Sequence, residues 1–276
     1  MALGLNCKKN DFELENQVQN IIRFVQPFWL SRRLMKKTRQ IMKNLFYGKL
    51  LGALALGLVS LQSVAQSRQV ALKNYTGISV ASGIDLYLRQ GATETAVIEA
   101  DRDISEQVLI EQQGESVTIR FKNGFSWKNV FNSKPVKVYA SYKNLKAITA
   151  SGGSDVFGQN AVKSASLYLK ASGGSDLKLQ VACSNLKVEV SGGSDADLSG
   201  KTTNMSLSAS GGSDIDAFNL VSDYAQIRAA GGSDVNARVN KALEAGASGG
   251  SDVTFKGEAT LKKTTSSHSG DVKRAK

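Results

Sequence analysis

The sequence predicts an all-β protein, a right-handed parallel β-helix or β-solenoid with coils of about 19 residues and a less regular N-terminal β cap. Three observations predict this fold. The tetrapeptide Gly-Gly-Ser-Asp occurs six times, at intervals of 18–21 residues. Apolar and polar residues alternate on both sides of each copy, with the period of two that is typical of a strand. Glycine is frequent, at 26 residues, whereas proline, at 2, is nearly absent, which fits short strands joined by tight turns.

Each repeat is expected to turn at its glycine pair. Glycine adopts a positive φ without a steric penalty, and Ser and Asp side chains form hydrogen bonds with nearby backbone groups in turns. A degenerate copy occupies residues 82–85, and another ends at Asp271. The glycines of the six full copies are Gly152, Gly153, Gly173, Gly174, Gly192, Gly193, Gly211, Gly212, Gly231, Gly232, Gly249 and Gly250.

The flanks of each copy predict which side chains face the interior. Leu186, Val188 and Val190 precede one turn, and the residues between them are the polar Lys187 and Glu189. Such alternation gives a strand one apolar and one wet face. If coils stack, equivalent residues form rows about 4.8 Å apart. The same parity directs the first Gly and the Ser of each turn inward, and the second Gly and the Asp outward.

The stacked aspartates would repel one another unless something offsets their charge. Each carboxylate could accept backbone N–H groups of its own turn, which is the favoured interpretation, or calcium ions could bridge successive coils through oxygen ligands. The calcium alternative makes these side chains weak candidate metal ligands, and no other cofactor is expected. The residues concerned are Asp155, Asp176, Asp195, Asp214, Asp234 and Asp252.

The N-terminal part is interpreted as a targeting sequence rather than a folded domain. Residues 35–65 combine basic residues, the apolar run 50–61 and a small-x-small end at Ala65, the pattern of a cleaved signal peptide. Residues 1–34 are expected to be an upstream extension from a misplaced start codon. The mature protein would then have no integral membrane segment. It is expected to be exported, to the periplasm, the outer-membrane surface or the medium.

The mature chain is expected to have two continuous parts. Residues 66–145 contain strands with weaker repetition and form the N-terminal β cap, and residues 146–276 form the repeat solenoid. Within the cap segment, Phe125, Trp127 and Phe131 are candidate ligand-binding aromatics, because exposed aromatic side chains anchor ligands. The alternative is that these rings close the end of the solenoid.

Composition argues against two function classes. The net charge is +11, but residues 1–65 carry +7 of it and the rest of the chain only +4. Basic residues scattered singly along strands do not indicate nucleic-acid binding. His268 is the single histidine, so no His-based catalytic or metal cluster is expected. A carboxylate-based polysaccharide enzyme stays an alternative, although each candidate acid copies the repeat and an active site normally breaks one.

The export signal, the degenerate opening at 82–85 and the repeated Ser-Gly-Gly-Ser-Asp units resemble the bacterial family "putative auto-transporter adhesin, head GIN domain". The resemblance spans roughly residues 75–256. It implies a β-helix-like fold in an exported protein and gives no catalytic residues. The function expected is therefore a non-catalytic, adhesin-like binding or structural protein of the envelope. Its partner would be a glycan, an envelope protein or another copy of the chain.

Overall fold

The computed structural model describes residues 67–124, 135–264 and 270–275. Within these ranges nearly all regular structure is β, and one short helix, α3 (Arg102–Ser105), is present. No helix in the described ranges is long and apolar enough to span a membrane. The strands are β1 (Arg68–Ala71), β2 (Gly77–Ala81), β3 (Asp85–Gln90), β4 (Thr95–Glu99), β5 (Val108–Gln113), β6 (Ser116–Phe121), β7 (Lys137–Tyr142), β8 (Ala147–Ser151), β9 (Val156–Gly158), β10 (Val162–Ser172), β11 (Leu177–Ser191), β12 (Asp195–Ser210), β13 (Asp214–Ala230), β14 (Asp234–Ser248), β15 (Asp252–Lys256), β16 (Thr260–Lys263) and β17 (Asp271–Arg274).

The long strands β10 to β14 each bend in the middle. In β11 the alternation of buried and outward side chains is interrupted at residues 183–185, which all lie outward or half-buried. Each coil therefore has two arms, joined by this bend at one edge and by the Gly-Gly turn at the other. We call the stacked arms that lead into the turns face A and the stacked arms that follow the turns face B.

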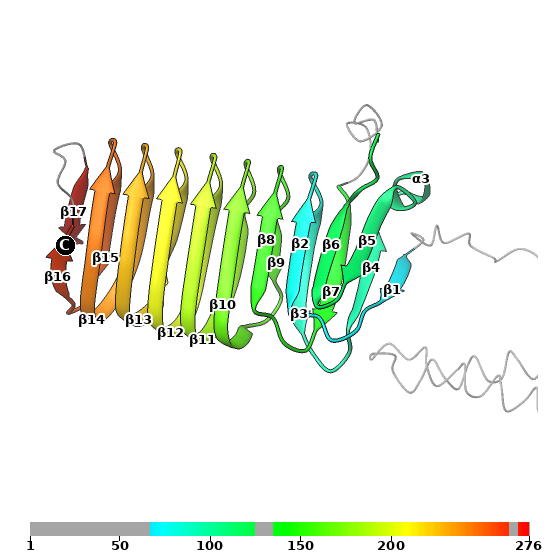
Figure 1. Ribbon diagram of the computed structural model, residues 1–276, viewed down its shortest axis with the longest axis horizontal. Coiled ribbons are helices and arrows are strands. Elements are labelled where there is room, and N and C mark those ends of the chain that lie inside the picture. Colours follow the sequence, from blue (N-terminus) through cyan, green and yellow to red (C-terminus); the bar gives the residue numbers. More distant parts are fainter. Residues whose placement is uncertain (1–66, 125–134, 265–269, 276) are drawn as a thin grey trace, which may run out of the picture. The chain divides into compact units, whose positions relative to one another are not determined.

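Equivalent residues of successive coils lie side by side in parallel register. On face A, Leu186 pairs with Leu167 on one side and Met205 on the other. On face B, Leu177 pairs with Ala196. This register is the one that the sequence spacing predicts, so the parallel β-solenoid with coils of about 19 residues is confirmed (Figure 1). The right-handed sense of the coil stays a prediction.

The N-terminal end of the stack does not follow chain order. Strand β2 pairs in parallel with both β6 and β8, and β3 pairs in parallel with both β7 and β9. Residues 77–90 thus form a coil between the β6–β7 coil and the β8–β9 coil (Figure 1). The solenoid therefore reaches into the segment expected to be only a cap. Strands β4 and β5 run antiparallel to β7 and β6 and end the parallel stack.

The core is a set of rows of aliphatic side chains between the two faces. One such row runs through Leu169, Val188, Leu207, Ile227 and Ala245, all nearly or fully buried. Burying one Val, Leu or Ile side chain stabilises the fold by roughly 1.5–3 kcal/mol. Since each row repeats through several coils, the stability of the stack comes from many equivalent contacts between neighbouring coils.

Candidate functional site

The turn edge of the solenoid holds the twelve glycines singled out by the sequence. Each of them has a positive φ, between 62° and 77°. Both glycines of every turn are exposed, so the expectation that the first one faces inward is wrong. The positive φ of the two glycines turns the backbone outward at this point, and the parity of the preceding strand resumes at the serine. The serine that follows does face inward as expected, and all six serines are fully buried.

The buried serines form a hydrogen-bond ladder between coils. The backbone N–H of Ser154 donates to Ser175 Oγ at 3.0 Å, and that of Ser175 donates to Ser194 Oγ at 3.0 Å. The pattern continues to Ser213, Ser233 and Ser251, with distances of 3.0–3.3 Å. Each hydroxyl thus supplies an acceptor for a buried N–H group of the preceding coil. A buried donor left without such a partner would cost about 1–3 kcal/mol.

The aspartates form a second ladder that runs the opposite way. The N–H of Asp176 donates to Asp155 Oδ1 at 3.0 Å, and the N–H groups of Asp195, Asp214 and Asp234 donate likewise to the aspartate one coil earlier, at 3.1–3.2 Å. The expectation that each carboxylate bonds within its own turn is therefore wrong for Asp155, Asp176, Asp195 and Asp214, which accept the N–H of the aspartate one coil later. Asp252 is held differently, by an ion pair of its Oδ2 with Lys273 Nζ at 3.3 Å.

The aspartate ladder gives little support to a metal site. Within residues 67–124, 135–264 and 270–275, no group of three or more His, Cys, Asp or Glu side chains is arranged to hold a metal ion. One oxygen of each of four carboxylates already accepts an N–H group of the protein. The candidate aromatics Phe125, Trp127 and Phe131 lie outside the described residues.

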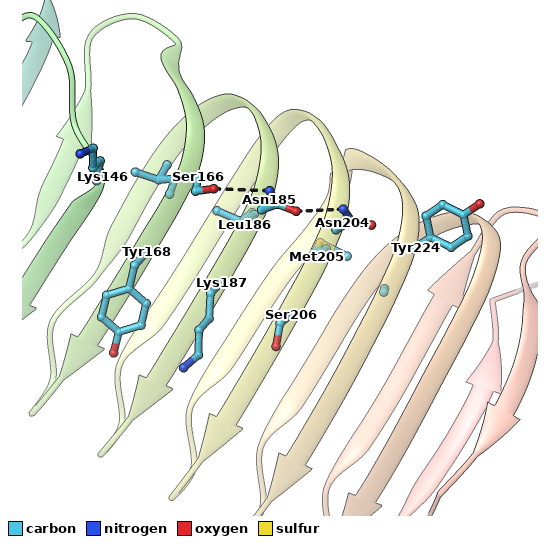
Figure 2. Close-up of a pocket in the computed structure, with 12 residues that line it drawn as sticks. Lys146, Ser166, Tyr168, Asn185, Leu186, Lys187, Asn204, Met205, Ser206 and Tyr224 are labelled. Atoms are coloured by element: carbon cyan, nitrogen blue, oxygen red, sulfur yellow. Dashed lines mark hydrogen bonds between the residues drawn. The ribbon is translucent and has the colours of Figure 1, made fainter.

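A groove follows the opposite, bend edge of the solenoid. It has a volume of about 470 Å³ and crosses the coils of β10, β11, β12 and β13. Figure 2 shows its lining side chains arranged as parallel rows, one residue from each coil. The residues that line it are Lys146, Ser166, Leu167, Tyr168, Asn185, Leu186, Lys187, Asn204, Met205, Ser206, Tyr224 and Ala225.

One row of the groove is a ladder of amides. Asn204 Nδ2 donates to Asn185 Oδ1 at 2.9 Å, and Asn185 Nδ2 donates to Ser166 Oγ at 3.4 Å (Figure 2). A side-chain amide has two donors and two acceptor lone pairs. The ladder uses one donor of each asparagine, so donors and acceptors stay available to a ligand at the spacing of the coils.

A second row carries an aromatic ring and a cation. Tyr168 Oη donates to Glu189 Oε2 at 2.5 Å, Lys187 Nζ lies 2.9 Å from Glu189 Oε1, and Lys187 also lies over the Tyr168 ring, 5.5 Å from its centroid. Burial, together with the hydrogen bond to Glu189 and its charge, raises the pKa of Tyr168 to about 12. The hydrogen bonds from Tyr168 and Lys187 hold the pKa of Glu189 below its usual value. At neutral pH Tyr168 is therefore protonated and Glu189 is ionised.

The far end of the groove repeats this pairing of a tyrosine with a lysine. Tyr224 is 46% exposed, and Lys241 Nζ lies 5.5 Å from its ring centroid. Lys241 also pairs with Asp223 at 2.8 Å, and this hydrogen bond and charge raise the pKa of the lysine. At the near end, Lys146 forms none of the ion pairs recorded among the described residues. Of the twelve described residues that line the groove, none is acidic.

The sequence did not reveal this groove, because its residues are ordinary inward and outward positions of the repeat. Asn185 and Asn204 stand nineteen residues apart, at the same position of two successive repeats, and this was the available signal. The groove lies at the bend, and no particular residue type marks the bend in the sequence.

Comparisons with known proteins give the same fold. The family model described as "Putative auto-transporter adhesin, head GIN domain" matches residues 74–259. A putative adhesin from Bacteroides fragilis is similar with a TM-score of 0.70 at 20% identity, and a putative lipid binding protein from Parabacteroides distasonis with 0.60 at 17%. A putative adhesin from Parabacteroides merdae has a TM-score of 0.59 at 18% identity. Each alignment covers 76% of this chain and 96% of the other. No curated protein sequence matches the chain.

Proposed function

Because the chain belongs to the head GIN domain family, we propose that it is an exported, non-catalytic, adhesin-like protein that binds an acidic oligosaccharide in the groove along its bend edge. The observation that carries this proposal is the repeated lining of the groove. The amides of Asn185 and Asn204, on two successive coils, offer hydrogen bonds to hydroxyl groups. Lys146 forms none of the ion pairs of the described residues, and Lys187 pairs with Glu189, which does not line the groove. The family name and two of the similar structures, called adhesins, support a binding role.

The spacing of the groove suits an extended sugar chain. Successive coils repeat about every 4.8 Å. This distance is close to the length of one pyranose unit in an extended polysaccharide. The floor is formed by Leu167, Leu186, Met205 and Ala225. Apolar side chains of this kind can contact the C–H faces of sugars, while the amide ladder binds their hydroxyl groups. Carboxylates on the sugar would pair with Lys146, and with Lys187 in competition with its ion pair to Glu189, in charge-assisted hydrogen bonds.

A binding assay with defined polysaccharides tests the proposal. The purified full chain is titrated with polygalacturonate, alginate and hyaluronate, and with dextran as the neutral comparison. We expect binding of at least one acidic polymer that weakens as salt is raised, because salt screens exposed charges. K146Q and K187Q should each weaken binding about tenfold, the loss of one hydrogen bond to a charged group.

The matched control for these variants is K178Q. Lys178 is on face B and pairs with Asp197 at 3.5 Å, with both side chains largely exposed, so its removal should leave binding unchanged. Equal weakening by K178Q would mean that only the total charge matters. Equal binding of dextran and the acidic polymers, or no binding of any of them, would contradict the proposal.

A lipid is the second candidate ligand, and two observations favour it. The floor of the groove is aliphatic, and one similar structure is called a putative lipid binding protein. A fatty acyl chain would lie on the floor with its carboxylate at Lys146 or Lys187. Titration with the fluorescent fatty acid cis-parinaric acid separates the candidates. Saturable binding that palmitate displaces, and polygalacturonate does not, would favour the lipid.

Export is proposed from the N-terminal sequence, whose residues 35–65 lie outside the described ranges. Cleavage after Ala65 would give a mature chain that begins at Gln66. N-terminal sequencing of the protein from fractionated cells checks this directly. Recovery of the protein only in the cytosol with the apolar run 50–61 intact would refute export.

A further inference from the structure

The further inference concerns a row of outward aromatic side chains on face B. The rings of Tyr139 and Tyr87 stack with centroids 4.9 Å apart and an interplanar angle of 21°. The rings of Tyr87 and Phe157 stack with centroids 5.1 Å apart and an angle of 23°. All three side chains are only half-buried, and each comes from a different strand: β7, β3 and β9.

This row departs from the repeat. The equivalent positions in the following coils are Lys178, Asp197, Asp216 and Asn236, all polar. The aromatic residues therefore occur only where the out-of-order coil β2–β3 lies between its neighbours. Tyr139 and Phe157 are one repeat length apart in the sequence, and Tyr87, which comes from a distant segment, lies between them. A repeat that merely propagates does not produce such a convergence, whereas a functional site is expected to interrupt it.

The geometry leaves part of the rings accessible. The centroid separations of 4.9 and 5.1 Å are close to the spacing of neighbouring strands. All three side chains are half-buried, so part of each ring stays accessible from the solvent side. Cross-strand aromatic pairs also stabilise a sheet, and this stabilisation is compatible with a ligand on the solvent side.

The rows on either side of the rings carry groups that bind hydroxyls. One flank contains Glu99, Lys137 and Asp85, in register across β4, β7 and β3. Lys137 Nζ lies 5.9 Å from the Tyr87 ring centroid. The other flank contains Arg89 and Ser141. Since both signs of charge border the rings, a ligand with a large net charge would meet a like charge. A neutral ligand with many hydroxyl groups meets donors and acceptors on both sides.

We propose that the row of Tyr139, Tyr87 and Phe157 is a second binding site, separate from the groove, for a neutral carbohydrate whose sugar rings contact the aromatic side chains. The C–H groups of a pyranose would lie against the accessible parts of the rings. Its hydroxyl groups would donate to Glu99 or Asp85 and accept from Lys137 or Arg89. This site does not depend on the groove, because its residues lie on the other face of the solenoid.

Affinity electrophoresis of the full chain tests the site. The protein is run through native gels that contain hydroxyethylcellulose, xyloglucan, galactomannan or yeast mannan, and its mobility is compared with that in a gel without polysaccharide. We expect retardation by at least one of the four polymers. F157S should bind that polymer about tenfold more weakly, since aromatic contacts of this kind contribute on the order of 1 kcal/mol. Y87S should bind more weakly still.

Two kinds of control keep the result unambiguous. Y87F retains the ring and should bind like the unchanged protein. This control separates the loss of the ring from other effects of a change at residue 87. F218S removes an aromatic residue of β13 whose ring lies under Lys256 at 4.1 Å, and it should leave retardation unchanged, as should the groove variant K187Q. Phe157 stacks on one ring alone, so F157S is expected to fold. Retardation of folded F157S equal to that of the unchanged protein would overturn the proposal, as would no retardation by any of the four polymers.

Discussion

Replacing one glycine of a turn by alanine should have a different effect from replacing its neighbour. Gly192 and Gly193 have nearly the same φ, 72° and 70°. An alanine at either position is destabilised by about 1–2 kcal/mol in the left-handed conformation. The two positions differ in their surroundings. A Cβ at Gly192 would lie 3.2 Å from the backbone N of Gly173 in the preceding coil, whereas a Cβ at Gly193 would have no atom within 4 Å.

The comparison isolates the contact between coils. Both changes remove the same conformational freedom from the unfolded chain, so that effect cancels in the difference. We expect G193A to lower the free energy of unfolding by about 1–2 kcal/mol. G192A should lower it further, by about 1–3 kcal/mol, because the added methyl group forces the neighbouring backbone to shift.

Urea unfolding followed by far-ultraviolet circular dichroism measures both free energies. The slopes of the two transitions should agree, since both variants expose the same surface on unfolding. A G192A protein no less stable than G193A would refute the reasoning, because it would mean that the turns of successive coils are not in contact.

Three further predictions concern single side chains. S194A should lower the free energy of unfolding by about 1–3 kcal/mol, because it leaves the buried N–H of Ser175 without an acceptor; a loss in urea unfolding of under a few tenths would contradict this. Burial, and then the charge of Asp155, raise the pKa of Asp85 in the folded state above its ordinary value of 3.8. The charged carboxylate therefore destabilises the fold, and the free energy of unfolding falls as the pH rises from 3.8 through the pKa of the folded state. D85N should therefore raise the melting temperature at pH 7 and lose this advantage below pH 3.8, and a gain that persists at low pH would refute the assignment. G200A should unfold or strongly destabilise the protein in thermal melts, because the new Cβ would lie 2.1 Å from a carbonyl oxygen of the preceding coil, and near-unchanged melting would refute this.

The repeat allowed the coil and its register to be predicted because identical residues recur at nearly constant spacing. Leu186 and Met205 are nineteen residues apart in the sequence and are neighbours in the sheet. The inward direction of Ser194 and the outward direction of Asp195 also followed from parity. Parity could not predict the hydrogen-bond partner of each side chain. The aspartate N–H groups point along the stack, so the ladder joins coils rather than closing a turn.

The order of the coils at the N-terminal end could not be predicted. Sequence neighbours usually become spatial neighbours, but residues 77–90 lie between coils that follow them in the chain. One residue does mark this place. Ser82 stands where the full turns have their first glycine, and it has a φ of 74°. The coil on its outer side, β6–β7, is joined by residues 122–136 instead of a four-residue turn.

The two candidate sites were hidden for related reasons. The groove depends on the bend at residues 183–185, where the outward residues have no distinctive composition. The aromatic row depends on the pairing of β3 with both β7 and β9, which brings Tyr87 between Tyr139 and Phe157. Each of these aromatic residues stands alone in the sequence. Only the pairing of the strands turns them into a single surface.

The alignment of coils along one axis can be measured by double electron–electron resonance spectroscopy between pairs of spin labels. In variants that carry Cys7→Ser and Cys183→Ser, one spin label is placed at Lys178 and a second at Asn236, Thr254 or Lys273, which are the same position three, four and five coils away. Stacked coils predict backbone separations of about 14, 19 and 24 Å, a constant step per coil. Distances that do not rise in equal steps of this size would contradict the stacking on which both proposed sites depend.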